Sequence, residues 1–78
     1  MYYVYFIHNK ETGRSYIGYT EDLRRRIKQH KAKSPDLIYY EAYKSEDDAH
    51  RRERMLKERG QSVRRLKERI KVSLRITG

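Results

Sequence analysis

Between residues 15 and 30, a short run that favours β-structure passes directly into an amphipathic, basic helical pattern. Tyr16 and Tyr19 suit a strand, and Gly18 between them allows another part of the chain to approach closely. Thr20 has the side chain of a helix N-cap, so the strand is expected to end there and a helix to begin. A strand that leads immediately into a helix places side chains from both elements near one point.

The predicted helix has a charged outer surface and a narrow apolar stripe. Its first two residues after the cap are acidic, which suits the positive end of a helix dipole. Leu23 and Ile27 mark the stripe that would be buried, and Arg26 and His30 lie one turn apart at its margin. The strand and this helix can therefore direct a phenol, a guanidinium and an imidazole toward one another.

The chain has 78 residues, which is the length of one small domain, here residues 1–78. A domain of this size buries only about 60% of the surface that its unfolded chain exposes, so its core must be thin. Hydrophobic residues make up 36% and charged residues 40%, while eight tyrosines supply large surfaces that pack without a fully dry interior. An α/β (α+β) domain, in which helices cover a sheet, fits this balance.

Aromatic and β-branched side chains fill the N-terminal segment and predict a strand over roughly residues 2 to 8. Alternation places Tyr3 and Tyr5 on one face of that strand. Residues 9–14 form a short polar run with Asn and Gly, as in a hairpin loop. We therefore expect the first two strands to pair antiparallel, which would bring Tyr5 within reach of Tyr16.

The second half of the chain predicts one further strand and two helices. After a loop that contains the only proline, a strand is expected over residues 37–43. Ser45 is expected to cap the second helix, Gly60 to end it, and Ser62 to cap the third. The expected order is β-β-α-β-α-α, a three-stranded antiparallel sheet flanked by helices. For residues 70–78 a short strand, a frayed helix and a tail all stay open.

Glu53 is an unusual acid, because it falls between Ala49 and Leu56 on the apolar stripe of the second helix. A carboxylate on such a stripe is costly unless it is paired or binds a metal ion. Two interpretations stay open for Glu53: an ion pair with a neighbouring Arg or Lys, or a metal ligand.

The net charge of +9 favours a polyanionic partner, and nucleic acid is the first candidate. A basic surface without such a partner is nearly as compatible with the charge alone.

Cysteine is absent, which excludes disulfides, cysteine zinc sites and thiol catalysis and fits a reducing cytoplasm. No apolar run reaches the roughly 18 residues of a membrane span, and the N-terminus lacks the order of a signal peptide. We therefore expect a cytoplasmic protein without a membrane partner.

Five residues that could carry chemistry are expected on one side of the sheet: Tyr5, Tyr16, Arg26, His30 and Glu53. A lone tyrosine, histidine or arginine in such a place more often packs or is solvated than catalyses. The combination of these side chains, drawn from four elements, is what suggests a functional site.

In their order and spacing these residues resemble the GIY-YIG nuclease superfamily, in particular its small single-domain members. The tripeptides of residues 3–5 and 16–18 correspond to the two motif strands. An arginine lies ten residues after Tyr16, and a histidine lies four residues beyond it. Residues 49–57 resemble the helix that carries the acid of the family.

The resemblance implies a metal-dependent DNA endonuclease, structure-specific or non-specific, that hydrolyses phosphodiester bonds in DNA repair, recombination or processing. By similarity, the motif tyrosines are Tyr5 and Tyr16, the catalytic arginine is Arg26, a further active-site position is His30, and the ligand of one Mg²⁺ or Mn²⁺ is Glu53. The basic residues expected to bind nucleic acid are Arg24, Arg25, Lys28, Arg52 and Lys57.

DNA is the expected partner, RNA is not excluded, and the chain is expected to be a monomer or a weak dimer. One alternative is a catalytically weak or inactive nucleic-acid-binding module that uses the same basic surface. Another is a basic ribosome-associated or structural protein, which would leave Glu53 unexplained.

Overall fold

The structure, a computed structural model, describes residues 1–9, 11–29 and 35–76. Its elements follow one another in the order β1 (Tyr2–Asn9), β2 (Ser15–Thr20), α1 (Leu23–Gln29), β3 (Pro35–Tyr43), α2 (Glu46–Glu58), α3 (Gly60–Arg69) and α4 (Lys71–Ile76). The predicted α+β class and the order β-β-α-β-α-α are confirmed. Of the C-terminal segment left open, residues 71–76 form the last helix, α4, and residues 77–78 lie outside the described residues.

The three strands form one antiparallel sheet in the order β2-β1-β3. β1 is the central strand, and its residues 4–7 are all buried. In the hairpin, Tyr5 lies opposite Gly18, and Ile7 lies opposite Tyr16. Directly opposite residues share a face of the sheet, so Tyr5 and Tyr16 lie on the same face, as diagonal neighbours.

The polar loop between β1 and β2 is the predicted hairpin connection. The Asn9 side chain accepts hydrogen bonds from the backbone N–H groups of Glu11 and Thr12, at 2.9 and 3.3 Å. Gly13 has φ of 73°, a left-handed conformation that glycine adopts without a steric cost. The register of the hairpin is therefore fixed by local turn chemistry.

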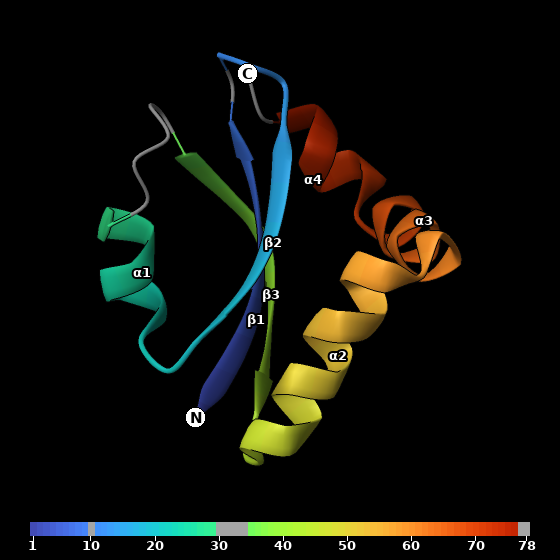
Figure 1. Ribbon diagram of the computed structural model, residues 1–78. Coiled ribbons are helices and arrows are strands. Elements are labelled where there is room, and N and C mark those ends of the chain that lie inside the picture. The colour runs from blue at the N-terminus through green and yellow to red at the C-terminus, as the bar shows by residue number, and fades with distance from the viewer. Residues whose placement is uncertain (10, 30–34, 77–78) are drawn as a thin grey trace.

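Helices cover the two faces of the sheet separately, with α1 on one side and α2, α3 and α4 on the other (Figure 1). The buried core lies on the second side and consists of Val4, Phe6, Ala49, Leu56, Leu66 and Ile70. α1 contains no fully buried residue, and its apolar residues Leu23 and Ile27 are half-buried. The face under α1 is therefore the more open one.

The predicted start of the first helix is wrong in detail. α1 begins at Leu23, and its cap is Asp22, whose carboxylate accepts from the Arg25 N–H at 3.0 Å. Thr20 instead forms a turn in which its hydroxyl accepts from the Asp22 N–H at 3.1 Å. Glu21 and Asp22 therefore precede the helix, because the Thr20 side chain is hydrogen-bonded within the turn before it.

α2 begins as predicted, since the Ser45 hydroxyl accepts from the Asp48 N–H at 3.4 Å. Its end differs from the prediction. Arg59 is both the last cap of α2 and the first cap of α3, and Gly60 is the first residue of α3. Ser62 therefore lies inside α3, because the chain bends at Arg59 in an extended conformation.

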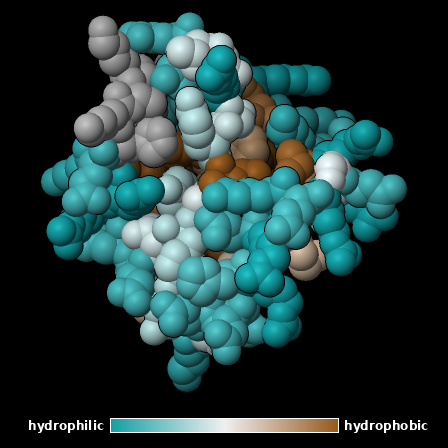
Figure 2. Space-filling view, viewed as in Figure 1, coloured by the Kyte–Doolittle hydropathy of each residue, from teal (hydrophilic) through white to brown (hydrophobic). Residues whose placement is uncertain are grey.

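Hydrophilic side chains dominate both flanks of the molecule, and hydrophobic atoms gather near the middle of the face that Figure 2 shows. This distribution fits a small sheet that is covered by charged helices. Across the described residues, every helix is too short or too polar to cross a membrane.

Candidate active site

The centre of the candidate site is a contact between Tyr5 of β1 and Arg26 of α1. Arg26 Nε donates a hydrogen bond of 3.1 Å to the Tyr5 hydroxyl. Tyr5 is only 3% exposed, whereas the Arg26 side chain lies at the surface. The hydrogen bond raises the pKa of Arg26 further, so this guanidinium is always charged.

Gly18 makes this contact possible. It lies opposite Tyr5 in the hairpin, and a Cβ atom at Gly18 would overlap the phenol ring of Tyr5, including its hydroxyl oxygen. The sequence pattern predicted a close approach at Gly18, and the structure identifies Tyr5 as the group that approaches. A side chain at position 18 would displace the phenol from Arg26.

Tyr16 extends the site toward solvent. It belongs to the edge strand β2, is 39% exposed, and shares the face of Tyr5. Tyr5, Tyr16 and Arg26 are therefore brought to one face of the sheet, as predicted. The fourth predicted residue, His30, lies outside the residues that the structure describes.

Glu53 is placed differently from the expectation that all five residues lie on one side. It belongs to α2, which packs on the opposite face from α1 (Figure 1). Its side chain is 20% exposed, and Glu53 Oε2 lies 3.2 Å from Lys57 Nζ. The ion pair with a neighbouring lysine, one of the two interpretations left open for Glu53, is present, and the sheet lies between Glu53 and α1.

The β2 edge contacts α2 through Tyr19, a residue that the sequence analysis used only as a strand former. Tyr19 donates a hydrogen bond of 2.8 Å to Glu46, and its ring stacks on His50 at 4.0 Å between centroids. Tyr19 also lines a surface hollow of about 380 Å³ together with Arg26. Tyr19 thus contacts α2 through Glu46 and His50 and also lines the hollow that contains Arg26.

His50 precedes Glu53 by three residues, so the two lie on adjoining turns of one helix face. Partial burial and the Glu46 carboxylate raise the pKa of the Tyr19 phenol, which stays neutral and donates a hydrogen bond to Glu46. The spacing of His50 and Glu53 was visible in the sequence, but the partner Tyr19 comes from a distant strand and gave no local signal.

Arg52 differs from the other predicted nucleic-acid contacts, because its guanidinium is engaged inside the protein. Its Nε and Nη2 atoms donate to both carboxylate oxygens of Glu41 on β3, at 2.9 to 3.1 Å. Tyr39 and Tyr43 also donate hydrogen bonds to Glu41. Arg52 therefore ties α2 to β3, and its partner is a carboxylate of this chain.

Glu41 keeps its charge in this network. Burial disfavours the carboxylate, but the hydrogen bonds from Arg52, Tyr43 and Tyr39 outweigh it and lower the pKa of Glu41. Conversely, burial and the Glu41 carboxylate raise the pKa of Tyr43 to about 12. The network thus consists of one anion, one cation and two neutral phenols, with every carboxylate oxygen bonded.

The other residues predicted to bind nucleic acid have exposed cationic side chains. Those of α1 are exposed: Arg24, Arg25 and Lys28. Lys57 is exposed as well and pairs with Glu53. The α1 cations surround Arg26 on its own helix, so a polyanion that reaches Arg26 also meets them.

A divalent metal ion would find one protein ligand of the right kind here. Within the described ranges, the His, Asp and Glu residues form no group of three or more that could hold a metal. Glu53 offers a half-buried carboxylate whose partner is the exposed Lys57, whereas the Glu41 carboxylate is occupied by Arg52 and two tyrosines. Mg²⁺ is commonly bound through one or two carboxylates while it keeps several waters. A mostly hydrated ion on Glu53 fits this donor set.

Comparison with known proteins agrees with the geometry. A family model described as the GIY-YIG catalytic domain matches residues 1–67, from β1 into α3. Neither the curated proteins nor the solved structures gave a match. The matched span includes Tyr5, Tyr16, Arg26 and Glu53, and it supports a nuclease-type activity on nucleic acid in general.

Proposed function

The chain belongs to the GIY-YIG catalytic domain family, and on this premise we propose that it is an endonuclease that hydrolyses DNA phosphodiester bonds with Mg²⁺ or Mn²⁺. The observation that carries the proposal is the hydrogen bond from Arg26 to Tyr5. It joins two family motif positions from different elements beside an exposed tyrosine and a cluster of cations. The whole chain, residues 1–78, would act as one nuclease domain in repair, recombination or processing of DNA.

Arg26 would bind the scissile phosphate. Its Nε is used by Tyr5, which fixes the plane of the guanidinium, and its Nη groups supply the donors that grip non-bridging oxygens. A fixed fork binds the phosphate more tightly as negative charge develops in the transition state. Arg24, Arg25 and Lys28 would attract the DNA backbone without taking part in the reaction.

Tyr16 would position the attacking water, because it is an exposed tyrosine on the face of the sheet that Tyr5 shares. In the reaction, the water oxygen forms a bond to phosphorus and its proton passes by way of the Tyr16 hydroxyl to solvent, while the bond from phosphorus to the 3′ oxygen breaks and that oxygen takes up a proton from solvent. The products are a 5′-phosphate and a 3′-hydroxyl. Tyr5 would hold Arg26 in place during this step.

Glu53 would hold the metal ion through its carboxylate. When bound, a divalent ion supplies Lewis-acid stabilisation of charge on the phosphate. Lys57 is the competing cation at Glu53, and its exposed side chain is free to turn into solvent when the ion arrives. Tyr19 stacks on His50 of α2 and lines the hollow that contains Arg26, and the DNA strand would pass along this edge of the sheet.

The test is nicking of supercoiled plasmid DNA with Mg²⁺, with Mn²⁺ and with chelator. We expect nicking by the wild type only with metal, and its loss in Arg26→Ala and in Glu53→Gln. Glu58→Gln is the matched control, because Glu58 is an exposed acid of the same helix. Tight DNA binding without nicking under any metal would favour the inactive binding module instead.

A further inference from the structure

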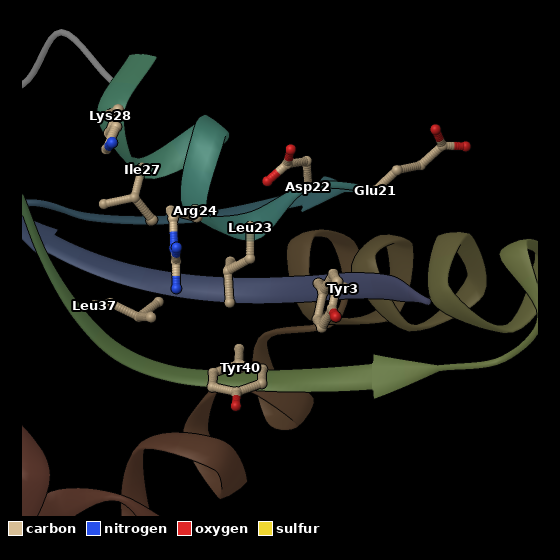
Figure 3. A pocket seen from close by; sticks show the side chains of 9 residues that line it. All are labelled: Tyr3, Glu21, Asp22, Leu23, Arg24, Ile27, Lys28, Leu37 and Tyr40. Carbon is tan, nitrogen blue, oxygen red and sulfur yellow. The ribbon is translucent and has the colours of Figure 1, made fainter.

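A second hollow lies on the far side of α1 from the Tyr19 hollow, between α1 and β3 (Figure 3). It is an open groove of about 660 Å³. Its floor is made by side chains of β1 and β3, and its wall by Leu23 and Ile27 of α1, which point toward the strands in Figure 3. We call it the β3 groove.

An irregularity in β3 creates this floor. The register of β1 and β3 shifts between Phe6 and Ile7, so that Phe6 lies opposite Tyr39 and Ile7 lies opposite Leu37. Ile38 is the extra residue, and it packs with Tyr39 against the core on the other face. Leu37 and Tyr40 are three residues apart in a strand, yet both line the β3 groove because of this bulge.

Aromatic surface is the main feature of the floor. Tyr3 and Tyr40 form an edge-to-face pair, with 6.0 Å between ring centroids and 64° between their planes. Tyr40 is 52% exposed, although it packs against the ring of Tyr3. The pair offers a held aromatic surface that is open to solvent.

The charges of the groove are divided between its ends. Arg24 extends from α1 across the groove toward the strands, and Lys28 follows one turn later on the same side (Figure 3). Glu21 and Asp22 lie at the other end. Asp22 caps α1 by accepting from the Arg25 N–H, which is a structural role. An anion would bind at the cationic end of the groove and be repelled from the acidic end.

We propose that the β3 groove binds an unpaired nucleotide of the substrate, with its base against Tyr40 and its phosphate against Arg24 and Lys28. The proposal rests on the proposed function, since it takes a nucleic acid as the ligand. Aromatic platforms beside cations bind single strands because every base has a face that can stack. In an intact duplex both faces of each base are covered, so the groove selects strands with unpaired bases.

The groove and Arg26 lie on opposite sides of one helix, whose diameter with side chains is about 10 Å. The stacked base therefore belongs to a nucleotide near the scissile phosphate and not to the reacting nucleotide itself. Arg25 lies on the exposed surface of α1 between the two places. The substrate class that follows is DNA with a single-stranded segment next to the cleavage point, such as a flap or a gap.

The experiment measures stacking directly, in metal-free buffer so that no cleavage occurs. A single-stranded oligonucleotide with one 2-aminopurine is titrated with wild type, Tyr40→Ala and Tyr40→Phe, and the same oligonucleotide in a duplex is the comparison. We expect quenching of the fluorescence by the wild type and by Tyr40→Phe, which keeps the ring. Tyr40→Ala should abolish quenching and weaken single-strand binding about 10-fold, with duplex binding changed less than about twofold.

Equal behaviour of Tyr40→Ala and Tyr40→Phe would overturn the proposal, as would equal quenching with duplex. Displacement of the oligonucleotide by polyglutamate of the same charge and length would also overturn it, because the groove would then recognise charge alone. A double variant, Arg24→Gln with Lys28→Gln, gives a second check: it should lower affinity and keep full quenching at saturation. Because these measurements need no catalysis, a failed nicking assay with intact quenching would reject the nuclease function alone.

Discussion

Arg26 Nε lies 3.1 Å from the Tyr5 hydroxyl, and this hydrogen bond joins α1 to the central strand over the surface of Gly18. The buried phenol has a fixed position in β1, and it holds one edge of an otherwise exposed guanidinium. A flexible surface arginine thereby becomes a fixed one, which lowers the entropy that is lost when it binds a phosphate. The contact depends on the absence of a side chain at Gly18.

Gly18→Ala should therefore damage both stability and activity. The added methyl group must push the Tyr5 ring, and such overpacking typically costs about 1–3 kcal/mol. We expect a lower melting temperature and a large loss of nicking. Gly60→Ala is the matched control, because a Cβ there meets nothing within 4 Å and Gly60 begins a helix. This control should be as stable as the wild type or slightly more stable.

Arg26→Lys should separate catalysis from attraction. Lysine keeps the charge but has no planar fork, so it cannot both bond to Tyr5 and grip two phosphate oxygens. We expect the cleavage rate to fall by about 100-fold or more, with DNA affinity within about twofold of the wild type. Rates at saturating protein and binding isotherms measure the two effects. A proportional fall in both would assign Arg26 to general phosphate binding.

Glu53→Gln should change the stability of the metal-free protein by less than about 1 kcal/mol, because its partner Lys57 is exposed and the pair is near the surface. Millimolar Mn²⁺ should raise the melting temperature of the wild type and leave that of the variant unchanged. Melting curves with and without Mn²⁺ measure both effects. A variant that is strongly destabilised without metal and still nicks DNA would contradict the role of Glu53 as metal ligand.

Glu41 should make stability depend on acidic pH. Its pKa is lowered in the folded state, so the unfolded chain takes up the proton first as the pH falls. The stabilisation is complete above the ordinary value of 4.5 and is lost as the pH falls through the lower, folded-state pKa. Thermal melts from pH 6 down to pH 2 should show this loss in the wild type.

Glu41→Gln should be less stable at neutral pH, since it leaves Arg52 partly buried without a counter-charge, at a cost of roughly 2–3 kcal/mol. Its melting temperature should then depend less on pH than that of the wild type. Glu58→Gln is the control, because Glu58 is exposed. Parallel pH profiles for wild type and Glu41→Gln would show that the acid sensitivity comes from other carboxyl groups.

Two charge variants should show whether DNA follows α1 or only the net charge. One replaces by glutamine three exposed cations of α1: Arg24, Arg25 and Lys28. The other replaces three exposed cations of α3, on the opposite side of the sheet: Arg64, Arg65 and Lys67. For duplex DNA, the α1 variant should reduce the slope of log affinity against log salt by about 2–3, and the α3 variant by much less. Equal slopes for the two variants would contradict an interface centred on α1.

Features set by neighbouring residues were predictable from the sequence. The aromatic and β-branched run predicted a strand over roughly residues 2 to 8, and the Asn and Gly of the next loop predicted its hairpin. Ser45 capped α2 as expected because its partner is three residues away. Tyr5 and Tyr16 share a face for the same reason, since alternation and a short hairpin fix their relation.

What the tertiary structure alone decided is which face of the sheet each helix covers and which distant residues meet. The sequence shows that Glu53 lies on an apolar stripe of its helix. Only packing places α2 on the face opposite α1 and brings Tyr19 of β2 into contact with α2. In the sequence Arg52 resembles its neighbouring cations. In the structure its Nε and Nη2 atoms donate hydrogen bonds to Glu41, which is eleven residues away. Local preferences act over a few residues. The placement of the helices and the contacts between distant residues depend instead on how much apolar area the whole chain buries, which cannot be read from a short segment.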